Sequence, residues 1–479
     1  MTGMKEAILE ADLTWTGAAF EAGIQVHVGA DGRIVDVVGL GEGPKARAPL
    51  AQGNALGRGD GSGGAADVGG PPSQPGALPR AEEARAFGPS PGPEIHRLRD
   101  RALLPGFVSA HSHAFQRGLR GRGETFPQGS GSFWTWREAM YGLVARLGAD
   151  DFQRLCLQTF REMRAAGITT VGEFHYFHHN AGTQDWACDD LVLQAATEAG
   201  IRIVLIQSYY RTGAIGQPLE GPQLRFAAPS PDAYWQQMDR LSARLDPRRQ
   251  SLAASVHSLR AASLDDLRLI YDEARRRDLV FHIHVEEQRR EIEDALAYYG
   301  RRPMDLLLET LGTATDLTAV HCTHTDPDDM QRFVAAGGTV CLCPLTEANL
   351  GDGIAAVPHL RSAGGSICLG TDSNARISAL EEMRWMEYAQ RLAGESRGIC
   401  RDGEGQVARV LLDAATVGGA NAIGLDVGRI APGAWADFAA IDLTARTLAG
   451  WEPETLLDAL VFGAAEEAIA GTCVGGEWG

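Results

Sequence analysis

Four apolar segments of the sequence end in side chains that could bind a metal ion or move protons. The first segment, LLPGFVSAHSH, ends in His111 and His113, whose imidazoles point to the same side if the segment is a strand. The segments HIHVEE, VHCTH and LGTDSN supply further such side chains, namely His284, Glu287, His321 and Asp372. Three imidazoles and one carboxylate from this set suit Zn²⁺ or Fe²⁺ and leave a position for water. A lone His-x-His pair is weak evidence, but its combination with the later residues predicts a metal site.

These side chains need a scaffold that brings the ends of several strands together. From Leu103 onward, apolar strand-like runs alternate with helical stretches. The eight runs are LLPGFVSAHSH, TTVGEFHYFHH, RIVLIQSYY, SLAASVHSL, LVFHIHVEE, LTAVHCTH, GTVCLCPLT and SICLGTDSN. Segments 150–166 and 263–277 have helical spacing with acidic starts and basic ends. The pattern predicts an α/β fold, a (β/α)₈ TIM barrel over residues 104–420, with its catalytic face at the C-terminal ends of the strands.

Both ends of the chain predict a second, smaller unit made of strands. In residues 1–103, the segment IQVHVGADGRIVDVV predicts a β-hairpin that turns at Asp31-Gly32. Residues 421–479 return to short strands, so we expect the two ends to form one small β-sandwich domain. Residues 41–92 are rich in Gly, Pro and Ala and predict a flexible insertion in this domain, without a phosphate-binding role.

The composition disfavours several classes of partner and chemistry. The 479 residues carry a formal charge of −18, which opposes binding to nucleic acid or to an anionic membrane. Residues 1–15 lack a signal-peptide pattern and no apolar run reaches the roughly 20 residues of a membrane span, so we expect a cytoplasmic protein. Only Lys5 and Lys45 are lysines, which excludes a P-loop, Schiff-base or carboxylated lysine from the predicted barrel. The eight cysteines form no Cys-x-x-Cys pair and predict reduced core residues.

The motifs LLPGFVSAHSH, HIHVEE, VHCTH and LGTDSN resemble those of the amidohydrolase superfamily, and the likeness covers the chain outside residues 41–92. The resemblance implies proton transfer or substrate polarisation by Glu287 and His321. It also implies one metal ion per subunit, Zn²⁺ or alternatively Fe²⁺, bound by His111, His113, His284 and Asp372. Binuclear members need a bridge such as a carboxylated lysine on the fourth strand. The corresponding run, SLAASVHSLRA, has no lysine, which favours the mononuclear, deaminase-like branch.

Further segments are similar to the formimidoylglutamate deiminase family, whose members hydrolyse N-formimidoyl-L-glutamate to N-formyl-L-glutamate and ammonia in histidine degradation. The segments are HSHAFQRGLRGR, SFWTWREAMY, EFHYFHH, VHSLRA and EEMRWMEYAQRL. This resemblance implies a homodimer and a set of substrate contacts, namely Gln116, Arg137, Tyr176, His257 and Arg260. The insertion 41–92 and the segment SNARIS after Asp372 depart from the family pattern.

The charges of this set agree with a dicarboxylate substrate. Such a substrate needs fixed cations near the metal, and arginine offers a bidentate fork for a carboxylate. We expect Arg137 in the loop region after the first strand and Arg260 just past the fourth strand, so both guanidinium groups can face the barrel mouth.

The resemblance also implies a hydrolytic mechanism. The metal would activate a water molecule for attack on the formimidoyl carbon. Asp372 would accept the proton of this water, Glu287 would deliver a proton to the imino nitrogen, and His321 would support the developing charge. Ammonia would then leave.

Other side chains near these motifs have simpler explanations. We expect structural or supporting roles for His175, His178, His179, His282 and Glu286. Three aromatic residues are expected to pack a loop over the site, namely Trp134, Trp136 and Tyr141.

Two other function classes stay open. The first is another aminohydrolase of the same branch, acting on a purine, a pterin or an adenosine-type substrate, which would require stacking and amide hydrogen bonds. The second is a non-enzymatic barrel kept as a scaffold, but such a protein would have lost metal or acid–base residues, and all six positions are filled here.

Overall fold

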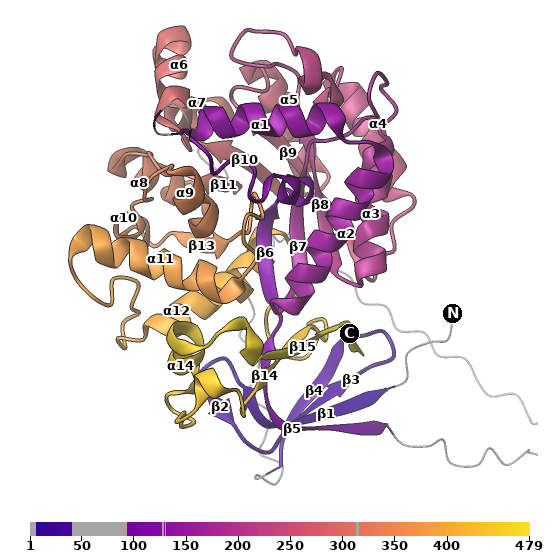
Figure 1. The fold of residues 1–479 in the computed structure, drawn as a ribbon, viewed down its shortest axis with the longest axis vertical. Coiled ribbons are helices and arrows are strands. Elements are labelled where there is room, and N and C mark those ends of the chain that lie inside the picture. Colours follow the sequence, from indigo (N-terminus) through magenta and orange to yellow (C-terminus); the bar gives the residue numbers. More distant parts are fainter. Residues whose placement is uncertain (1–5, 41–92, 127–128, 130, 313–315) are drawn as a thin grey trace, which may run out of the picture.

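The computed structural model describes residues 6–40, 93–126, 129, 131–312 and 316–479. Two sheets organise these residues, a barrel that makes up most of the molecule and a smaller sheet below it in Figure 1. The insertion predicted at 41–92 lies outside the described residues.

The barrel is a sheet of eight parallel strands, as the sequence predicts. The strands follow each other in chain order: β6 (Phe107–Ser112), β7 (Ile168–His175), β8 (Arg202–Tyr209), β9 (Gln250–Ser258), β10 (Phe281–Val285), β11 (Thr318–His321), β12 (Thr339–Leu342) and β13 (Ser366–Leu369). Strands β6, β7 and β10 are buried at every residue, including their serine, threonine, histidine and glutamate side chains, because a parallel barrel is covered on both faces.

The barrel closes between its first and last strands at the candidate metal residues. The backbone N–H groups of Thr371 and Asp372 donate to the carbonyl of His111, at 3.0 and 3.1 Å. The N–H of His113 donates to the carbonyl of Asp372 at 2.9 Å. Residues that are 260 positions apart in the sequence are therefore held together by the backbone of the fold itself.

Helices surround the barrel and cover its C-terminal end (Figure 1). Their bounds are α1 (Phe133–Arg146), α2 (Ala149–Ala165), α3 (Ala187–Ala199), α4 (Pro231–Ser242), α5 (Leu264–Arg276), α6 (Arg289–Tyr299), α7 (Pro303–Leu311), α8 (Pro327–Ala335), α9 (Pro344–Leu350), α10 (Val357–Ser362), α11 (Ala379–Gly394), α12 (Val407–Asp413), α13 (Gly419–Ala422) and α14 (Leu456–Gly463). The short turns η1 (Ala114–Leu119) and η2 (Gly221–Phe226) contribute to the barrel mouth.

Helices α2 and α5 confirm the two helical segments predicted from charge and spacing. Helix α5 begins after Ser263, whose side chain accepts a hydrogen bond from the N–H of Asp266, and its last turn is basic. Helix α1 differs from the prediction, because Arg137 lies on a helix rather than in a loop. A rigid helix therefore carries this guanidinium across the barrel mouth.

The smaller sheet joins the two ends of the chain in one continuous array of eight strands. Its order is β16 (Glu477–Trp478), β15 (Ile469–Val474), β14 (Phe438–Asp442), β5 (Glu94–Pro105), β1 (Ala7–Trp15), β3 (Ile24–Val28) and β4 (Ile34–Gly39), with β2 (Phe20–Glu21) paired to β1. The predicted hairpin is confirmed as β3–β4, with Gly32 at φ +84° in its turn. The sheet has its own apolar cluster, which includes Leu9, Val26, Leu103 and Phe438.

A buried carboxylate joins the smaller sheet to the barrel. Asp437, directly before β14, accepts hydrogen bonds from Arg202 Nε at 2.7 Å and Nη2 at 3.0 Å, from the start of β8. It also accepts from the N–H of Gly475 at 2.6 Å, in the turn between β15 and β16. These bonds connect the smaller sheet to the barrel sheet at the end of the barrel opposite the catalytic face.

Other sequence predictions concern the whole chain. All eight cysteines are free and buried, as expected for reduced core residues. Within the described ranges, no helix combines the length and apolar character needed to cross a membrane.

Candidate active site

Four side chains from β6, β10 and β13 or their ends converge on one point at the C-terminal end of the barrel. The Nε2 atom of His111 lies 3.2 Å from that of His113 and 3.1 Å from that of His284, and His113 and His284 are 3.4 Å apart. Asp372 Oδ1 lies 3.5 Å from His111 Nε2 and 3.4 Å from His113 Nε2. Five of the six separations between the four ligand atoms thus lie between 3.1 and 3.5 Å, and all are within 4.8 Å. Ligand atoms about 2.0–2.2 Å from one zinc ion have separations of this order.

Backbone carbonyls set the orientation of two of these imidazoles. His113 Nδ1 donates to the carbonyl of Phe174 at 2.7 Å, and His284 Nδ1 donates to the carbonyl of His257 at 2.9 Å. A neutral imidazole that donates from Nδ1 has its lone pair on Nε2. The Nε2 lone pairs therefore face one another and a carboxylate oxygen, an arrangement that a cation between them stabilises.

Burial keeps the three imidazoles neutral, as metal binding requires. It lowers the pKa of His111 to about 3 and also lowers the pKa of His113 and of His284. Burial raises the pKa of Asp372, but hydrogen bonding to His111 and the charge of His321 outweigh this and hold it well below its usual range. The group can thus offer three lone pairs and one negative charge to a divalent cation.

Glu287 and His321 lie beside this group, as expected from the sequence. His321 Nε2 is 3.7 Å from Asp372 Oδ2 and 3.8 Å from Glu287 Oε1. Its Nδ1 contacts Glu347 Oε1 at 3.3 Å. Burial alone would lower the pKa of His321, but the charge of Glu287, the hydrogen bond to Glu347 and the charge of Asp372 raise it to about 10. Burial raises the pKa of the Glu287 carboxyl against the opposing charge of His321, so these two side chains can exchange and deliver a proton next to the metal group.

The backbone at these strand ends is held in an unusual conformation. Glu286, His321 and Asp372 have φ values of +52°, +72° and +43°. The left-handed region is costly for residues with a side chain and persists where the surrounding structure imposes it. Here it occurs where β10, β11 and β13 end, at or next to Glu287, His321 and Asp372.

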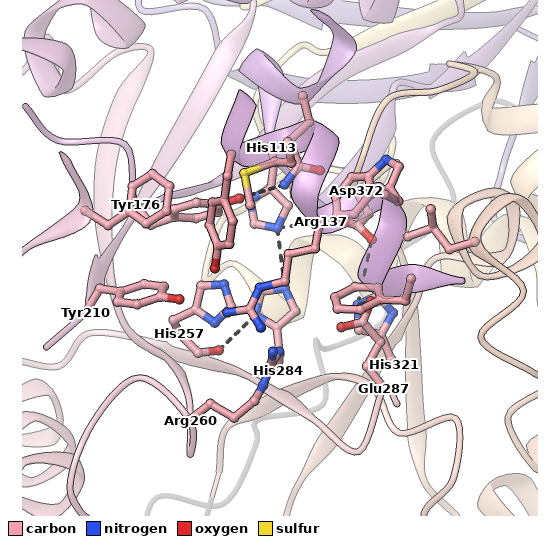
Figure 2. Close-up of a pocket in the computed structure, with 17 residues that line it drawn as sticks. His113, Arg137, Tyr176, Tyr210, His257, Arg260, His284, Glu287, His321 and Asp372 are labelled. Carbon is pink, nitrogen blue, oxygen red and sulfur yellow. Dashed lines mark hydrogen bonds and ion pairs between the residues drawn. The ribbon is translucent and has the colours of Figure 1, made fainter. Parts of the chain in front are cut away.

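A pocket opens from this group and contains every substrate-binding residue expected from the sequence. These residues are Gln116, Arg137, Tyr176, His257 and Arg260. Figure 2 shows Glu287, His321 and Asp372 on one side, with Tyr176, Tyr210 and His257 facing them. The His257 ring stacks on His284 with 4.7 Å between the centroids, and Gln116 Nε2 donates to the Tyr176 hydroxyl at 2.7 Å.

The pocket holds two guanidinium groups that lack acidic partners. Neither Arg137 nor Arg260 forms an ion pair with a carboxylate among the described residues. Arg260 is only 6% exposed, and its Nε has no hydrogen-bond partner there. In a chain with 62 acidic residues and 44 basic ones, two arginines without acidic partners in one pocket, Arg260 buried and Arg137 half-buried, indicate an anionic ligand.

Several pocket residues had no clear signal in the sequence. Tyr210, Phe226 and Leu350 line the pocket. Glu347 lies in α9, accepts from the N–H of Cys343 at 2.9 Å and contacts His321, but its segment PLTEANL carries no motif that indicates this contact. Trp136 and Tyr141, expected to pack over the site, also line the pocket itself.

The remaining histidines near the site have structural partners. Asp189 Oδ1 contacts His175 Nε2 at 2.9 Å and His178 Nδ1 at 3.0 Å, and Oδ2 accepts from two buried glutamines, Gln207 and Gln237. The three residues His175, His178 and Asp189 are close enough to hold a cation, but their hydrogen bonds already satisfy the carboxylate.

The other expected structural residues also have partners. His179 Nε2 bonds the carbonyl of Ala227, His282 Nε2 bonds the carbonyl of Ala422, and Glu286 accepts from Arg302 and the N–H of Met304. In the SNARIS segment, Asn374 Nδ2 donates to Ser112 Oγ at 3.1 Å, so it supports β6 rather than lining the pocket.

Comparison with known proteins agrees with this geometry. Residues 102–479 match the model of the amidohydrolase family. The chain is 38% identical over 383 residues to formimidoylglutamate deiminase from Pseudomonas aeruginosa, covering 79% of this chain and 84% of that protein. It is 28% identical to 8-oxoguanine deaminase of the same species, covering 78% of this chain and 81% of the relative.

Solved structures show the same architecture. An amidohydrolase from Brucella melitensis superposes with a TM-score of 0.80 and 27% identity, covering 98% of this chain and 94% of that one. An adenosine deaminase from Xanthomonas campestris with bound zinc superposes with a TM-score of 0.73 and 22% identity, covering 99% and 93%, and shares the fold. The barrel, its His₃Asp group and the family match over most of the chain lead to one conclusion: this chain belongs to the amidohydrolase family.

Proposed function

We propose that this chain is a metal-dependent deiminase that hydrolyses N-formimidoyl-L-glutamate to N-formyl-L-glutamate and ammonia. One observation supports the substrate most directly: Arg137 and Arg260, without acidic partners, share a pocket with the His₃Asp group and the Glu287–His321 pair. A dicarboxylate that carries an amidine matches this combination of cations and hydrolytic groups. The 38% identity to formimidoylglutamate deiminase from Pseudomonas aeruginosa supports the same substrate.

The substrate would be bound mainly through its charges. Arg137 and Arg260 each bind a carboxylate, because a guanidinium offers parallel N–H donors to two oxygens. Gln116, Tyr176 and His257 line the pocket beside them and offer further hydrogen bonds. Together they hold the formimidoyl carbon next to the metal group.

The hydrolysis uses the residues on the opposite side of the pocket. His111, His113, His284 and Asp372 would hold one divalent ion, which supplies Lewis-acid activation of water. Asp372 accepts a proton from the attacking water through the carboxylate oxygen that faces His321. Glu287 transfers a proton to the imino nitrogen, and the cationic His321 stabilises negative charge that develops on the attacking oxygen. The proton held by Asp372 then passes to the same nitrogen, which leaves as ammonia. The hydroxyl proton on carbon returns to Glu287, so the water oxygen stays on carbon as the formyl group.

Zinc is the proposed metal, because three nitrogen atoms and one carboxylate oxygen at these separations suit it, with Fe²⁺ as the alternative. The adenosine deaminase of the same fold contains zinc. A homodimer and a cytoplasmic location remain predictions of the sequence.

A second candidate is a deaminase that acts on a purine or pterin. The pocket contains Phe133, Trp136 and Phe226, aromatic rings that could stack on a planar base. Relatives at 28% identity include 8-oxoguanine deaminase and isoxanthopterin deaminase. Stacking does not explain two unpaired arginines, so the dicarboxylate is preferred.

Ammonia release distinguishes the two candidates. The metal-loaded protein should release ammonia from N-formimidoyl-L-glutamate and not from 8-oxoguanine, isoxanthopterin or adenosine, and chelation should abolish the release. Arg137→Met and Arg260→Met should each raise KM for the formimidoyl substrate, whereas the exposed Arg268→Met serves as the matched control. Ammonia release from a purine or pterin substrate alone would contradict the proposed substrate, but it would agree with the assigned metal and acid–base residues.

A further inference from the structure

Three tyrosine hydroxyl groups face the same pocket as Arg137. They belong to Tyr141, Tyr176 and Tyr210. Tyr176 and Tyr210 are only 2% and 4% exposed, and burial raises the pKa of both hydroxyls. Both therefore keep their protons at neutral pH and can act as donors.

Two of the three oxygens accept hydrogen bonds from amide side chains. Tyr176 accepts from Gln116 Nε2 at 2.7 Å, and Tyr141 accepts from Gln223 Nε2 at 2.9 Å. The orientation of the Gln223 amide follows from its other end, because Oε1 accepts from the N–H of Glu220 at 3.1 Å. Gln223 must therefore present its NH₂ group, and not its oxygen, to Tyr141.

Arg137 lies beside two of these tyrosines. Its positive charge acts on the hydroxyls of Tyr141 and Tyr210, and it opposes the rise that burial causes in the pKa of Tyr210. A guanidinium has no acceptor, so Arg137 cannot accept the proton of either hydroxyl. The hydroxyl protons of Tyr141 and Tyr210 are not donated in any hydrogen bond within the described part of the chain. Unused donors in a buried pocket are costly unless a ligand accepts from them.

The guanidinium is also held in place by rings. Arg137 Cζ lies 5.4 Å from the Trp134 centroid and 5.3 Å from the Tyr141 centroid. Tyr141 is in turn connected to η2, because Gln223 Nε2 also donates to the carbonyl of Gly213 at 3.3 Å. A Cβ on Gly213 would lie 2.5 Å from Gln223 Oε1, so this backbone packs closely on the glutamine. The position of Arg137 on α1 thus depends on a residue more than 80 positions away.

We propose that Tyr141 and Tyr210, together with Arg137, bind one carboxylate of the substrate, and that Gln223 is the positioning residue that holds Tyr141 for this contact. The carboxylate accepts the two unused hydroxyl protons while the guanidinium balances its charge. This inference rests on the proposed function, because it assigns one of the two substrate carboxylates to this subsite and leaves the other to Arg260.

The test uses substitutions that remove a hydroxyl and keep the ring. For metal-loaded Tyr141→Phe and Tyr210→Phe, we expect KM for N-formimidoyl-L-glutamate to rise about ten-fold or more, with kcat within about three-fold of the original. Calorimetry with the product N-formyl-L-glutamate should show the same loss of affinity without any turnover. Tyr388→Phe, a half-buried tyrosine on α11 that packs on Phe462, is the matched control.

Two comparisons identify the contact and the role of Gln223. N-formyl-L-glutamine and N-formyl-L-isoglutamine each lack one carboxylate, and with one of them Tyr210→Phe should have no further effect on affinity. Gln223→Leu should raise KM, and adding it to Tyr141→Phe should raise KM no further, because both changes disrupt one interaction.

Unchanged KM and product affinity in both tyrosine variants would overturn the inference, as would a fall in kcat with KM unchanged or an equal effect of Tyr388→Phe. If the unsubstituted protein does not hydrolyse N-formimidoyl-L-glutamate, the proposed function fails instead. Glutarate affinity of the same variants then decides the carboxylate subsite by itself.

Discussion

At the scale of single residues, two buried carboxyl groups behave differently from ordinary acids. Glu287 and Glu173 both lie on the catalytic side of the barrel, and burial raises the pKa of each. Glu287 faces the pocket and the cationic His321. Glu173 lies on β7 opposite Ser112 of β6, where its Oε1 accepts from the N–H of Ala114 at 2.6 Å and Oε2 has no described partner. The first suits proton transfer, and the second affects stability.

Glu287→Gln should lower kcat roughly 10²–10⁴-fold, because the amide cannot transfer the proton that the imino nitrogen requires. KM should change little, since the amide keeps the size of the side chain. Steady-state ammonia release measures both constants. Glu293→Gln, an exposed carboxylate on the following helix, is the control. A kcat within ten-fold of the original would contradict the assigned role.

Glu173 should make the protein less stable as pH rises. Burial raises its pKa from 4.5 to about 8, so between these values it is protonated in the folded state and ionised in the unfolded chain. The free energy of unfolding contributed by this group is fully present below about pH 4.5 and is lost as pH rises through about 8, with a slope of about 1.4 kcal/mol per pH unit. Urea unfolding from pH 5 to pH 8 should show a smaller decline for Glu173→Gln than for the original protein. Equal declines would show that Glu173 titrates normally.

At the scale of elements, the seam between β6 and β13 determines where the metal residues meet. Gly370 lies in this seam, and a Cβ there would be 2.8 Å from both Cβ and the carbonyl oxygen of His111. Gly370→Ala should displace His111 and lower both metal content and kcat, which elemental analysis and ammonia release measure. Gly403→Ala, where a Cβ would meet no atom within 4 Å, is the control. Full metal content in the first variant would mean that the seam tolerates displacement.

The connection between the smaller sheet and the barrel is a second element-scale feature. Asp437→Asn removes one charge of a buried ion pair and leaves Arg202 without its carboxylate. The expected loss is about 3–5 kcal/mol of the free energy of unfolding, measured by urea titration. Glu198→Gln should cost under about 1 kcal/mol, because its pair with Arg161 is more than half exposed. Similar losses in both variants would contradict a structural role for the buried pair.

The strands and their end residues could be predicted from the sequence, whereas contacts made by helices over the barrel mouth could not. The apolar runs that alternate with helical stretches predict the eight strands. Residues at the strand ends, such as His111 and His321, can be located from this pattern alone. Glu347 meets His321 only because α9 folds back after β12, and nothing in its own segment indicates that contact. Arg137 was expected in a loop, because its segment follows the first strand of the barrel. It lies instead on helix α1, which crosses the barrel mouth rather than following a strand in the usual position. Backbone strain at His321 and Asp372 is likewise a property of the closed barrel.

At the scale of the whole molecule, the fold places two positively charged arginines in the same pocket as the His₃Asp group, which carries negative charge. The chain carries a charge of −18, yet the pocket contains two guanidinium groups without acidic partners among the described residues. The electrostatic field of the net negative charge therefore does not attract a dicarboxylate, and recognition of the substrate depends on the charges inside the pocket. Removing the metal should leave substrate binding by Arg137 and Arg260 largely intact while ending hydrolysis.

The most direct measurement is product analysis with the metal-free protein before and after it receives one equivalent of zinc. After zinc is added, N-formimidoyl-L-glutamate should give N-formyl-L-glutamate and ammonia in equal amounts, and the metal-free protein should give neither. Formation of formamide and glutamate would show that the other carbon–nitrogen bond is cleaved and would contradict deimination. Absence of any product from the zinc-loaded protein would contradict the proposed substrate.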